Sequence, residues 1–422
     1  MIKSTMAKPF YNSTIPSDWE IKSLSELGTF SKGKGILKEQ VISEGLPCVR
    51  YGEIYTTYDF IVKKFKSFIS NEVAKECKEI KEGDVLFAGS GETAEEIGKA
   101  VAYIGTEKAF AGGDVIILST KKEVDTACLS YALETDFAKK QKRTLGQGNS
   151  VVHIYSSDLG KLKIPLPPLP EQKAIAHILG LADDAINKNN QLIAQKELYK
   201  KWLMQNLLTG KKRLKSNEKR KIDSGEFVKI KVQDIATVFS GGTPLRKYSE
   251  FYKGTIPWIK SGEINNFEIF ETEEKITEEA IRNSTTKKVT KDTILIALYG
   301  ATAGVVGITR IEAAINQAVL AVIPDESKVD RMYLLRCFQF YLPKAVENLV
   351  QGGQPNLSGG IILNYQFSIT NSLSEQVAIA QVLQVSDKEI QLLKAKTEKL
   401  REKKKGLMQV LLTGKKRLKI NK

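Results

Sequence analysis

The chain has few of the residues from which catalytic and metal centres are built. It contains only two histidines, His153 and His177, among 422 residues. Two histidines leave little material for a metal site or a Ser-His-Asp arrangement. The four cysteines are far apart and form no C-x-x-C pair, so they indicate neither a disulfide framework nor a zinc knuckle. We therefore expect no metal and no cofactor, and we interpret the cysteines as buried thiols.

Long apolar runs are also lacking. No stretch approaches the roughly 18 apolar residues that span a bilayer, and the N-terminus has no apolar targeting segment. We expect a cytoplasmic protein without a membrane partner. The 64 basic residues outnumber the 49 acidic ones, which gives a net charge of +15. This excess favours a polyanionic partner, with nucleic acid first, although a merely soluble basic protein stays open as an alternative.

Three short segments resemble catalytic motifs, but each lacks a required part. FAGSG at residues 87–91 resembles the glycine turn that holds S-adenosylmethionine in methyltransferases. No N-P-P-[YF] or D-P-P-[YF] tetrapeptide follows to hold an extruded base. Residues 91–100 lack the spacing and the Ser/Thr of a phosphate-binding loop. PDESK at residues 324–328 has the letters of a nuclease motif, but contiguous residues cannot place two acids on separate strands. A self-sufficient methyltransferase using FAGSG is the alternative enzyme hypothesis.

A long internal repeat organises the chain. The sequence LLTGKKRLK occurs at residues 207–215 and again at residues 411–419, a separation of 204. Glu171-Gln172 and Glu375-Gln376 match at the same separation, and LPCVRYGEI at residues 46–54 resembles IPWIKSGEI at residues 256–264. This period is longer than that of solenoid repeats. The pattern predicts two copies of one domain, each followed by a helical arm.

Both arms have the apolar spacing of a helix. The first begins near Pro170, the second carries leucines every seven residues, and the arms end at Gly210 and Gly414, where a left-handed cap is expected. Some 40 residues correspond to about 60 Å of helix. We expect the arms to pack antiparallel and to leave a second face for other proteins; two arms that serve different partners are the alternative. The apolar residues expected to contact the other arm or a partner subunit are Ile175, Leu179, Ile186, Ile193, Leu203, Leu383, Ile390, Leu393, Leu400 and Leu407.

The parts before the arms read as α+β globules. Short β-rich runs with turn residues between them predict strands, and longer helical patterns follow in each copy. The predicted strands include residues 84–88, 114–118, 293–298 and 318–323, and the predicted helices cover residues 126–142 and 331–350.

Glycine-containing loops in the globules carry the candidate nucleic-acid contacts. Arginine and lysine suit guanine edges and phosphates, whereas asparagine and glutamine suit adenine edges. For any single residue, a solvated loop side chain is the alternative interpretation. The candidates are Lys32, Lys34, Arg50, Tyr51, Arg143, Gln147 and Asn149 in the first globule, and Arg246, Lys247, Lys260, Ser261, Gln354 and Asn356 in the second.

The two divergent globules, the repeated E-Q-x-A-I-A at the start of each arm and the L-L-T-G at its end resemble the specificity (S) subunit of Type I restriction-modification systems. The resemblance implies an α+β fold in which two target recognition domains are separated by two long antiparallel helices forming a coiled coil, with a pseudo-two-fold internal repeat. The implied boundaries are residues 1–18 for an N-terminal segment, 19–166 and 222–370 for the recognition domains, and 167–221 and 371–422 for the helical arms.

The resemblance also implies the partners. Each recognition domain would read one half of a bipartite, asymmetric sequence in double-stranded DNA. Two modification (M) subunits would methylate adenine at N6 with S-adenosylmethionine, and restriction (R) subunits would use ATP to translocate and cleave DNA. The S subunit would carry none of this chemistry. A coiled-coil interaction protein with incidental basic charge is a further alternative.

Overall fold

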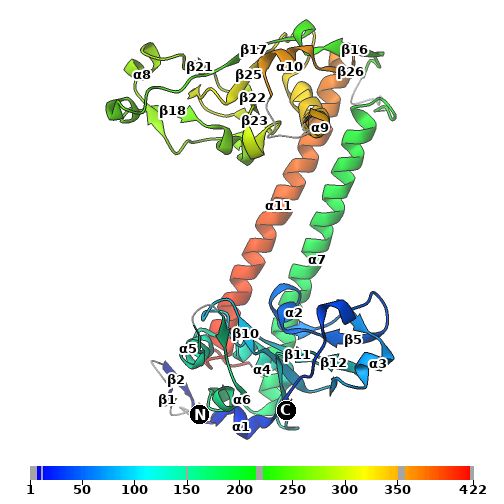
Figure 1. Ribbon diagram of the computed structural model, residues 1–422, viewed down its shortest axis with the longest axis vertical. Helices are drawn as coiled ribbons and strands as arrows, with labels where there is room; N and C mark the ends of the chain where they lie inside the picture. Colours follow the sequence, from blue (N-terminus) through cyan, green and yellow to red (C-terminus); the bar gives the residue numbers. More distant parts are fainter. Residues whose placement is uncertain (1–6, 11–12, 149–150, 215–221, 350–356, 419–422) are drawn as a thin grey trace, which may run out of the picture. The chain divides into compact units, whose positions relative to one another are not determined.

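The computed structural model describes residues 7–10, 13–148, 151–214, 222–349 and 357–418. It divides into two compact units, one made of residues 1–190 and 395–422 (unit 1) and the other of residues 191–394 (unit 2). Each unit combines one globule with one segment from each of two 39-residue helices, α7 (Leu169–Leu207) and α11 (Leu373–Leu411) (Figure 1). The α+β class and the internal repeat are confirmed.

The globule of unit 1 contains a five-stranded and a four-stranded sheet. The strand order is β4-β13-β9-β11-β6 in the first sheet and β7-β5-β12-β8 in the second. Every residue of β9 and β11 is buried, which explains why, apart from Asp84, their sequences contain no charged residue. The strands are β4 (Gly28–Lys32), β13 (Val115–Thr120), β9 (Asp84–Ala88), β11 (Ala100–Tyr103) and β6 (Ile61–Val62), then β7 (Ser67–Ile69), β5 (Leu46–Val49), β12 (Ala109–Ala111) and β8 (Lys78–Ile80).

Unit 2 repeats this topology strand for strand. Its sheets have the orders β17-β25-β22-β23-β19 and β20-β18-β24-β21. The four strands predicted from sequence are confirmed to within one or two residues. The strands of unit 2 are β17 (Ala236–Ser240), β25 (Val319–Pro324), β22 (Ile294–Ala297), β23 (Val306–Thr309) and β19 (Glu268–Ile269), then β20 (Lys275–Ile276), β18 (Ile256–Ile259), β24 (Ala313–Ile315) and β21 (Lys287–Val289).

The helices after the sheets differ between the units. In unit 2, α9 (Arg331–Leu349) is one continuous helix, as predicted. In unit 1 the single helix predicted over residues 126–142 is wrong, because the segment breaks into α4 (Thr126–Ala132) and α5 (Asp136–Leu145). Glu134 lies in the break and pairs with the buried ammonium of Lys142 at 2.9 Å. The break thus supplies a carboxylate that a buried cation requires.

A two-stranded sheet closes each globule next to its arm. In unit 1, β3 (Glu20–Ser23) pairs with β15 (Lys163–Leu166), and in unit 2, β16 (Phe227–Lys231) pairs with β26 (Gln366–Thr370). Unit 1 has two further strand pairs, β1 (Ala7–Phe10) with β2 (Ser13–Pro16) and β10 (Ser90–Gly91) with β14 (Val152–His153).

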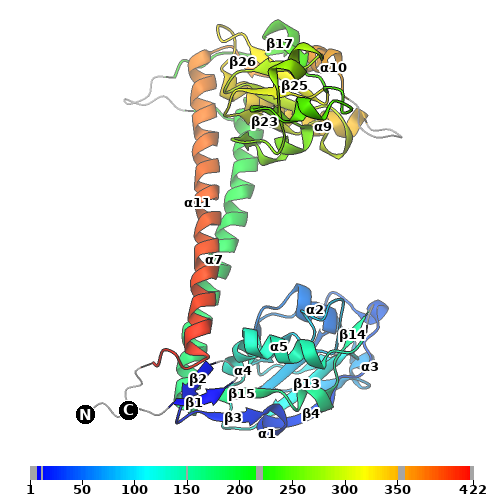
Figure 2. The same ribbon diagram turned by 90° about the vertical axis from the view of Figure 1, so that its left-hand side faces the viewer.

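The segments of α7 and α11 run antiparallel within each unit (Figures 1 and 2). In unit 1 the Asn189 amide donates to the Thr397 hydroxyl at 2.7 Å, and Asp183 pairs with Lys404 at 2.5 Å. In unit 2 the α7–α11 ion pairs include Lys196–Glu389 and Glu197–Lys394, both at 2.7 Å. In unit 1, Asn189 follows Asp183 along α7, whereas its partner Thr397 precedes Lys404 along α11. The predicted antiparallel packing is therefore confirmed.

The ten apolar arm residues differ in what they contact. Those nearest a globule belong to its core, so the arms are built into the globules as well as against each other. Contact with a partner subunit stays a prediction for all ten. Ile175 and Leu179 lie in the core of unit 1, Leu203 and Leu383 lie in the core of unit 2, Ile186 and Ile390 are buried on the arms, and Ile193, Leu393, Leu400 and Leu407 are half-buried.

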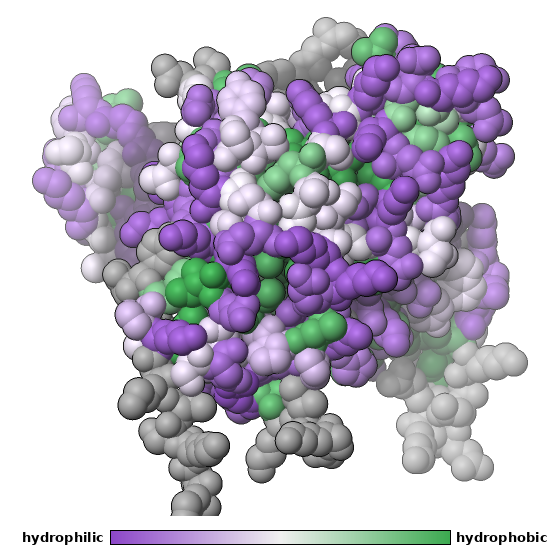
Figure 3. All heavy atoms as spheres, turned by 90° about the horizontal axis from the view of Figure 1, so that it is seen from below, coloured by the Kyte–Doolittle hydropathy of each residue, from purple (hydrophilic) through white to green (hydrophobic). Residues whose placement is uncertain are grey.

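The surface shown in Figure 3 is mostly hydrophilic, as the many charged residues of the sequence lead one to expect. Hydrophilic residues cover most of the face shown in Figure 3, and apolar residues form small separate patches on it. Among the described residues, none of the helices is long and apolar enough to cross a bilayer.

Both arms end at a glycine with a left-handed backbone, which confirms the predicted cap. The φ angle is +72° at Gly210 and +71° at Gly414. Each glycine also lies against the first residues of a globule. A Cβ atom would come within 2.7 Å of the Phe227 ring at Gly210 and within 2.3 Å of Pro16 Cδ at Gly414. Backbone conformation and close approach both require glycine here.

We expect Gly414→Ala to lower the free energy of unfolding of unit 1 by at least about 1–2 kcal/mol, the cost of a left-handed non-glycine residue. The contact with Pro16 adds to that cost. The matched control is Gly406→Ala, because Gly406 lies inside α11 with nothing within 4 Å of an added Cβ. The control should gain about 0.5–1 kcal/mol. Urea unfolding compares the two variants, and equal stability would contradict the assigned role of Gly414.

Candidate nucleic-acid interface

The structure brings Arg246 and Lys260 together around one carboxylate. The Arg246 guanidinium donates to both Glu274 oxygens at 2.6 and 3.1 Å, and the Lys260 ammonium donates to Glu274 at 3.0 Å and to Glu273 at 2.9 Å. Hydrogen bonds from Arg246 and Lys260 lower the pKa of Glu274, and the two glutamates raise the pKa of Lys260. Glu274 and Lys260 are therefore both ionised at neutral pH. Figure 1 shows β18, which leads into Lys260, at the edge of unit 2 away from α9.

Two aromatic rings hold the arginine in place. The guanidinium carbon of Arg246 lies 4.1 Å from the centre of the Tyr252 ring and 5.4 Å from that of Trp258. Trp258 is fully buried, and its ring nitrogen donates to the Gly242 carbonyl at 3.3 Å. Stacking on a fixed ring reduces the conformational freedom of a guanidinium. The sequence signal for this support is the aromatic content of residues 248–258.

The related sequences RYGE and KSGE form the same local structure in the two units. The backbone N–H of Lys260 donates to Glu263 at 2.7 Å, at the start of the 3-10 helix η4 (Ser261–Asn266). The backbone N–H of Arg50 donates to Glu53 at 3.2 Å, at the start of α2 (Tyr51–Thr56). The candidates Arg50 and Tyr51, and likewise Lys260 and Ser261, thus occupy equivalent capped turns.

In unit 1 the candidates gather around the turn at residues 112–114. The backbone N–H of Lys34 donates to the Ala111 carbonyl at 3.3 Å, and the Lys32 ammonium lies 3.6 Å from Asp114. Gly112 faces Arg50, because a Cβ built on this glycine would lie 3.6 Å from the Arg50 Cα. Lys32, Lys34 and Arg50 therefore share one loop region although they are up to 18 positions apart in the sequence.

Gln147 and Arg143 lie beside the β10–β14 pair. Gln147 exchanges two backbone hydrogen bonds with His153, at 2.8 and 2.9 Å, and Arg143 pairs with Glu95 at 3.2 Å. The Ser90 hydroxyl lies 2.9 Å from His153 Nδ1, so the end of FAGSG forms part of this strand pair.

Three candidates, Asn149, Gln354 and Asn356, lie outside the described residues. Lys247 has its ammonium 4.8 Å from the centre of the Tyr248 ring, with no ion pair among the described residues. Most other candidate cations already have an acidic partner, including Lys34, which pairs with Glu76 at 3.2 Å. Binding to phosphate would therefore exchange a carboxylate for a phosphate oxygen. Within the described ranges, no group of three or more metal-ligating side chains occurs.

The repeated Glu and Arg at the two ends of the arms form a junction that sequence reasoning missed. In unit 1, Arg417 donates to both oxygens of the buried Glu171 at 2.6 and 2.7 Å, and also pairs with Asp18 at 2.9 Å. In unit 2, Arg213 donates to both oxygens of the buried Glu375 at 2.6 and 2.5 Å. The end of one arm is thus fastened to the beginning of the other. Identity at a separation of 204 was the signal that could have found these pairs.

The repeated glutamines connect each arm to its own globule. The side-chain oxygen of Gln172 accepts from the backbone N–H of Asp125 at 2.7 Å, and that of Gln376 accepts from Asp330 at 2.7 Å. Both glutamines are buried, and each also donates to a backbone carbonyl at 2.8 Å. A buried amide with its hydrogen bonds satisfied fixes the angle at which the arm leaves the globule.

The chain is similar in sequence to proteins of a known family. The family model for the type I restriction modification DNA specificity domain matches residues 16–197 and 224–402. The chain is 27% identical over 429 aligned residues to the type I restriction enzyme MjaVIII specificity subunit of Methanocaldococcus jannaschii, covering 98% of this chain and 96% of that protein. It is 28% identical over 432 residues to the putative MjaX specificity subunit of the same organism, covering 96% and 95%.

The fold is shared with a solved structure. The crystal structure of the type I restriction-modification S subunit from M. genitalium superposes with a TM-score of 0.61 at 17% identity, covering 96% of this chain and 98% of that one. The family model matches both repeats and most of the chain. The chain therefore belongs to the family of type I restriction-modification DNA specificity subunits.

Proposed function

We propose that the chain reads a bipartite, asymmetric sequence in double-stranded DNA, with one globule for each half. The observation that carries this proposal is the pair of equivalent capped turns, one in each unit, that present Arg50 with Tyr51 and Lys260 with Ser261. Repetition of the framework gives two readers, and the different side chains on it give each reader its own target. Arginine and lysine on such loops recognise phosphates and guanine edges.

The catalytic work belongs to partners in this proposal. Two M subunits methylate adenine at N6, R subunits cleave DNA, and this chain positions them on the target. Ser90 and Gly91, the end of FAGSG, are engaged in a strand pair. The arms offer the surface on which partners assemble.

Co-expression with the cognate M subunit, followed by sequencing of methylated adenines, tests the proposal. We expect one motif made of two specified halves and a fixed unspecified gap. The chain alone, given DNA and labelled S-adenosylmethionine, should transfer no methyl groups. Methyl transfer by the chain alone would favour the methyltransferase alternative. Affinity for DNA in the presence of M should fall steeply with salt, because phosphate contacts release counterions. An interaction that is absent or insensitive to salt would favour the coiled-coil alternative.

A further inference from the structure

One position at the end of the central strand has the same backbone structure in both units but different chemistry. The strands β9 and β22 have the same place, the middle, in their five-stranded sheets. The residue after each strand, Gly89 or Leu298, accepts a backbone hydrogen bond from a loop later in the chain, at 3.0 and 2.9 Å. The next residue is Ser90 in unit 1, which is buried, and Tyr299 in unit 2, which is exposed. The two units thus share the framework here and differ in the side chain that it carries.

Ser90 supports a histidine on the neighbouring strand. Its hydroxyl lies 2.9 Å from His153 Nδ1, across the pair of β10 and β14. Ser90 is buried, and its hydroxyl has no other hydrogen-bond partner among the described residues. A buried hydroxyl needs an acceptor for its hydrogen. The hydroxyl therefore donates to Nδ1, and the proton of the neutral imidazole lies on Nε2.

The second ring nitrogen of His153 is available to a ligand. His153 is exposed, and Nε2 has no hydrogen-bond partner within the described ranges. A hydrolytic serine–histidine pair is not indicated, because Ser90 is buried and cannot reach a substrate. The pair instead presents one N–H donor on a ring whose orientation the serine holds.

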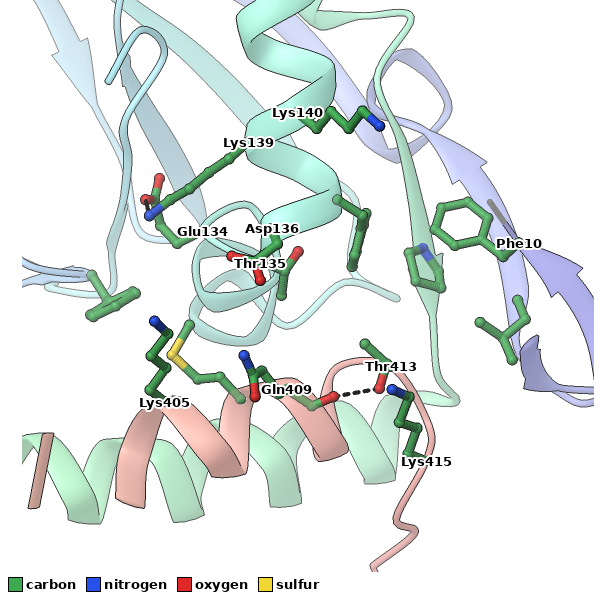
Figure 4. Close-up of a pocket in the computed structure, with 15 residues that line it drawn as sticks. Phe10, Glu134, Thr135, Asp136, Lys139, Lys140, Lys405, Gln409, Thr413 and Lys415 are labelled. Atoms are coloured by element: carbon green, nitrogen blue, oxygen red, sulfur yellow. Dashed lines mark hydrogen bonds and ion pairs between the residues drawn. The ribbon is translucent and has the colours of Figure 1, made fainter. Parts of the chain in front are cut away.

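The strand that carries His153 is also fixed by its surroundings. A Cβ atom built on Gly146, just after α5, would come within 2.8 Å of the residue before His153. The helix α5 is anchored by the buried Lys142, which donates at 2.9 Å to a backbone carbonyl of the loop that follows β10 and pairs with Glu134. Glu134 also pairs with Lys139 at 3.3 Å, and Figure 4 shows these two side chains pointing toward each other. A donor on so closely packed a support has little freedom to move.

The donor lies beside the capped turn on which the proposed function rests. A Cβ atom built on Gly91, next to Ser90, would lie 2.8 Å from the Tyr55 hydroxyl, and Tyr55 belongs to α2, the helix that begins at the capped turn. In unit 2 the 3-10 helix η5 (Gly300–Thr302), which follows Tyr299, packs against η4. The loop after the central strand therefore adjoins the capped turn in both units.

A fixed N–H donor of this kind suits guanine. In the major groove guanine offers two acceptors, O6 and N7, whereas adenine has an amino donor beside its N7. We propose that His153, positioned by Ser90, is a specificity-determining residue that donates to a guanine in the half-site read by unit 1, with Tyr299 as its counterpart in unit 2. This inference rests on the proposed function and deepens it, because it adds a second reading element to each unit and names the base that one of them recognises.

Methylation by the chain together with M tests the proposal. His153→Ala should turn one G·C pair of the wild-type motif into an unspecified position, with discrimination there falling roughly tenfold. The other half of the motif should be unchanged, which also shows that the variant is folded. His153→Gln keeps an N–H donor and should relax the position less. Tyr299→Ala should relax a position in the other half only. The matched control is His177→Ala, because His177 is the only other histidine and is exposed on α7; it should keep the whole motif.

Nitrogen NMR of the full chain with isotope-labelled histidine tests the support without M or DNA. The chain has two histidines, so the His177→Ala variant assigns the signals of His153. Wild-type His153 should carry its proton on Nε2. In Ser90→Ala the Nδ1 signal should shift because its hydrogen bond is lost, and the same G·C pair should relax in part. A proton on Nδ1 in the wild type would contradict the assigned donor.

The outcomes separate this inference from the proposed function. A bipartite wild-type motif that His153→Ala leaves unchanged, or relaxes only at an A·T pair, would refute the role of His153 while the proposed function stands. A wild-type chain that directs no bipartite motif would overturn the proposed function and this inference together.

Discussion

Replacing both Arg246 and Lys260 with alanine is expected to reduce methylation at the recognition motif by roughly a hundredfold to a thousandfold. The two cations converge on Glu274, and Arg246 is held against Tyr252, so under the proposed function both would contact DNA at one place. A base or phosphate contact of this kind contributes about 1–3 kcal/mol to recognition. Losing both contacts at once therefore corresponds to a loss of roughly a hundredfold to a thousandfold in methylation. Methylation rates on defined duplexes, with M present, measure the effect.

The half of the motif in which specificity is lost distinguishes base recognition from a general effect of positive charge. Sequencing of the remaining methylated sites should show relaxation in only one half of the motif. Lys34→Ala with Arg50→Ala, in unit 1, should relax the other half. Lys229→Ala with Lys291→Ala removes two exposed lysines of unit 2 outside the cluster and should change the rate less than threefold. Equal losses in this control and in the cluster variant would contradict specific contacts.

Arg213→Leu is expected to destabilise unit 2 by about 3 kcal/mol at pH 7, because it leaves the fully buried Glu375 without its cation. Burial alone would raise the pKa of Glu375, but hydrogen bonds from Arg213 and Thr370 outweigh burial and place the pKa below its usual value. The carboxylate therefore stabilises the wild type above the unfolded-state pKa of about 4.3, and this contribution disappears as the pH falls through the lower folded-state pKa.

The pH dependence of the variant should reverse. Without Arg213, burial raises the pKa of Glu375 in the folded state, so the penalty is present above that raised pKa and is relieved as the pH falls toward 4.3. Urea unfolding between pH 4 and 7 measures both slopes. Adding Glu375→Gln should recover part of the lost stability. Arg401→Leu, which removes an exposed ion pair with Glu398 on α11, should cost less than about 1 kcal/mol. A variant with the slope of the wild type would argue against the junction.

The buried strands could be predicted because their signal is local, and the repeat could be predicted because its two copies share identical residues at one separation. Continuous apolar runs such as residues 85–88 need no knowledge of their neighbours to be recognised as parts of buried strands. The break between α4 and α5 could not be predicted in this way, because it depends on the buried ammonium of Lys142, eight positions from Glu134. Helical periodicity continues through both segments and conceals the break.

The sequence identified residues of the candidate site, but it did not show which of them form ion pairs with one another. Loop position and residue type identified Arg246 and Lys260 as candidates. Their common partner Glu274 lies 28 positions from Arg246, and only the β18–β20 pairing brings the segments together. The equivalence of Arg50 with Lys260 was visible in the sequence, whereas the pairing of Arg213 with Glu375, 162 positions apart, was marked only by the repetition of both residues at a separation of 204. Pairs of this kind depend on tertiary structure and leave no local pattern.

Unit 1 is built from two segments that lie far apart in the sequence, and this determines when it can finish folding during synthesis. Its core includes Leu411 and Leu412, so it remains incomplete until residues 395–418 have been translated. At about 5–20 residues per second, the ribosome needs roughly 10–50 s to pass from residue 190 to that segment. Unit 2, which is contiguous in the sequence, is complete before then. The half of the protein that is made first is therefore the last to close, and its unfinished core is the part that a chaperone would shield on the nascent chain.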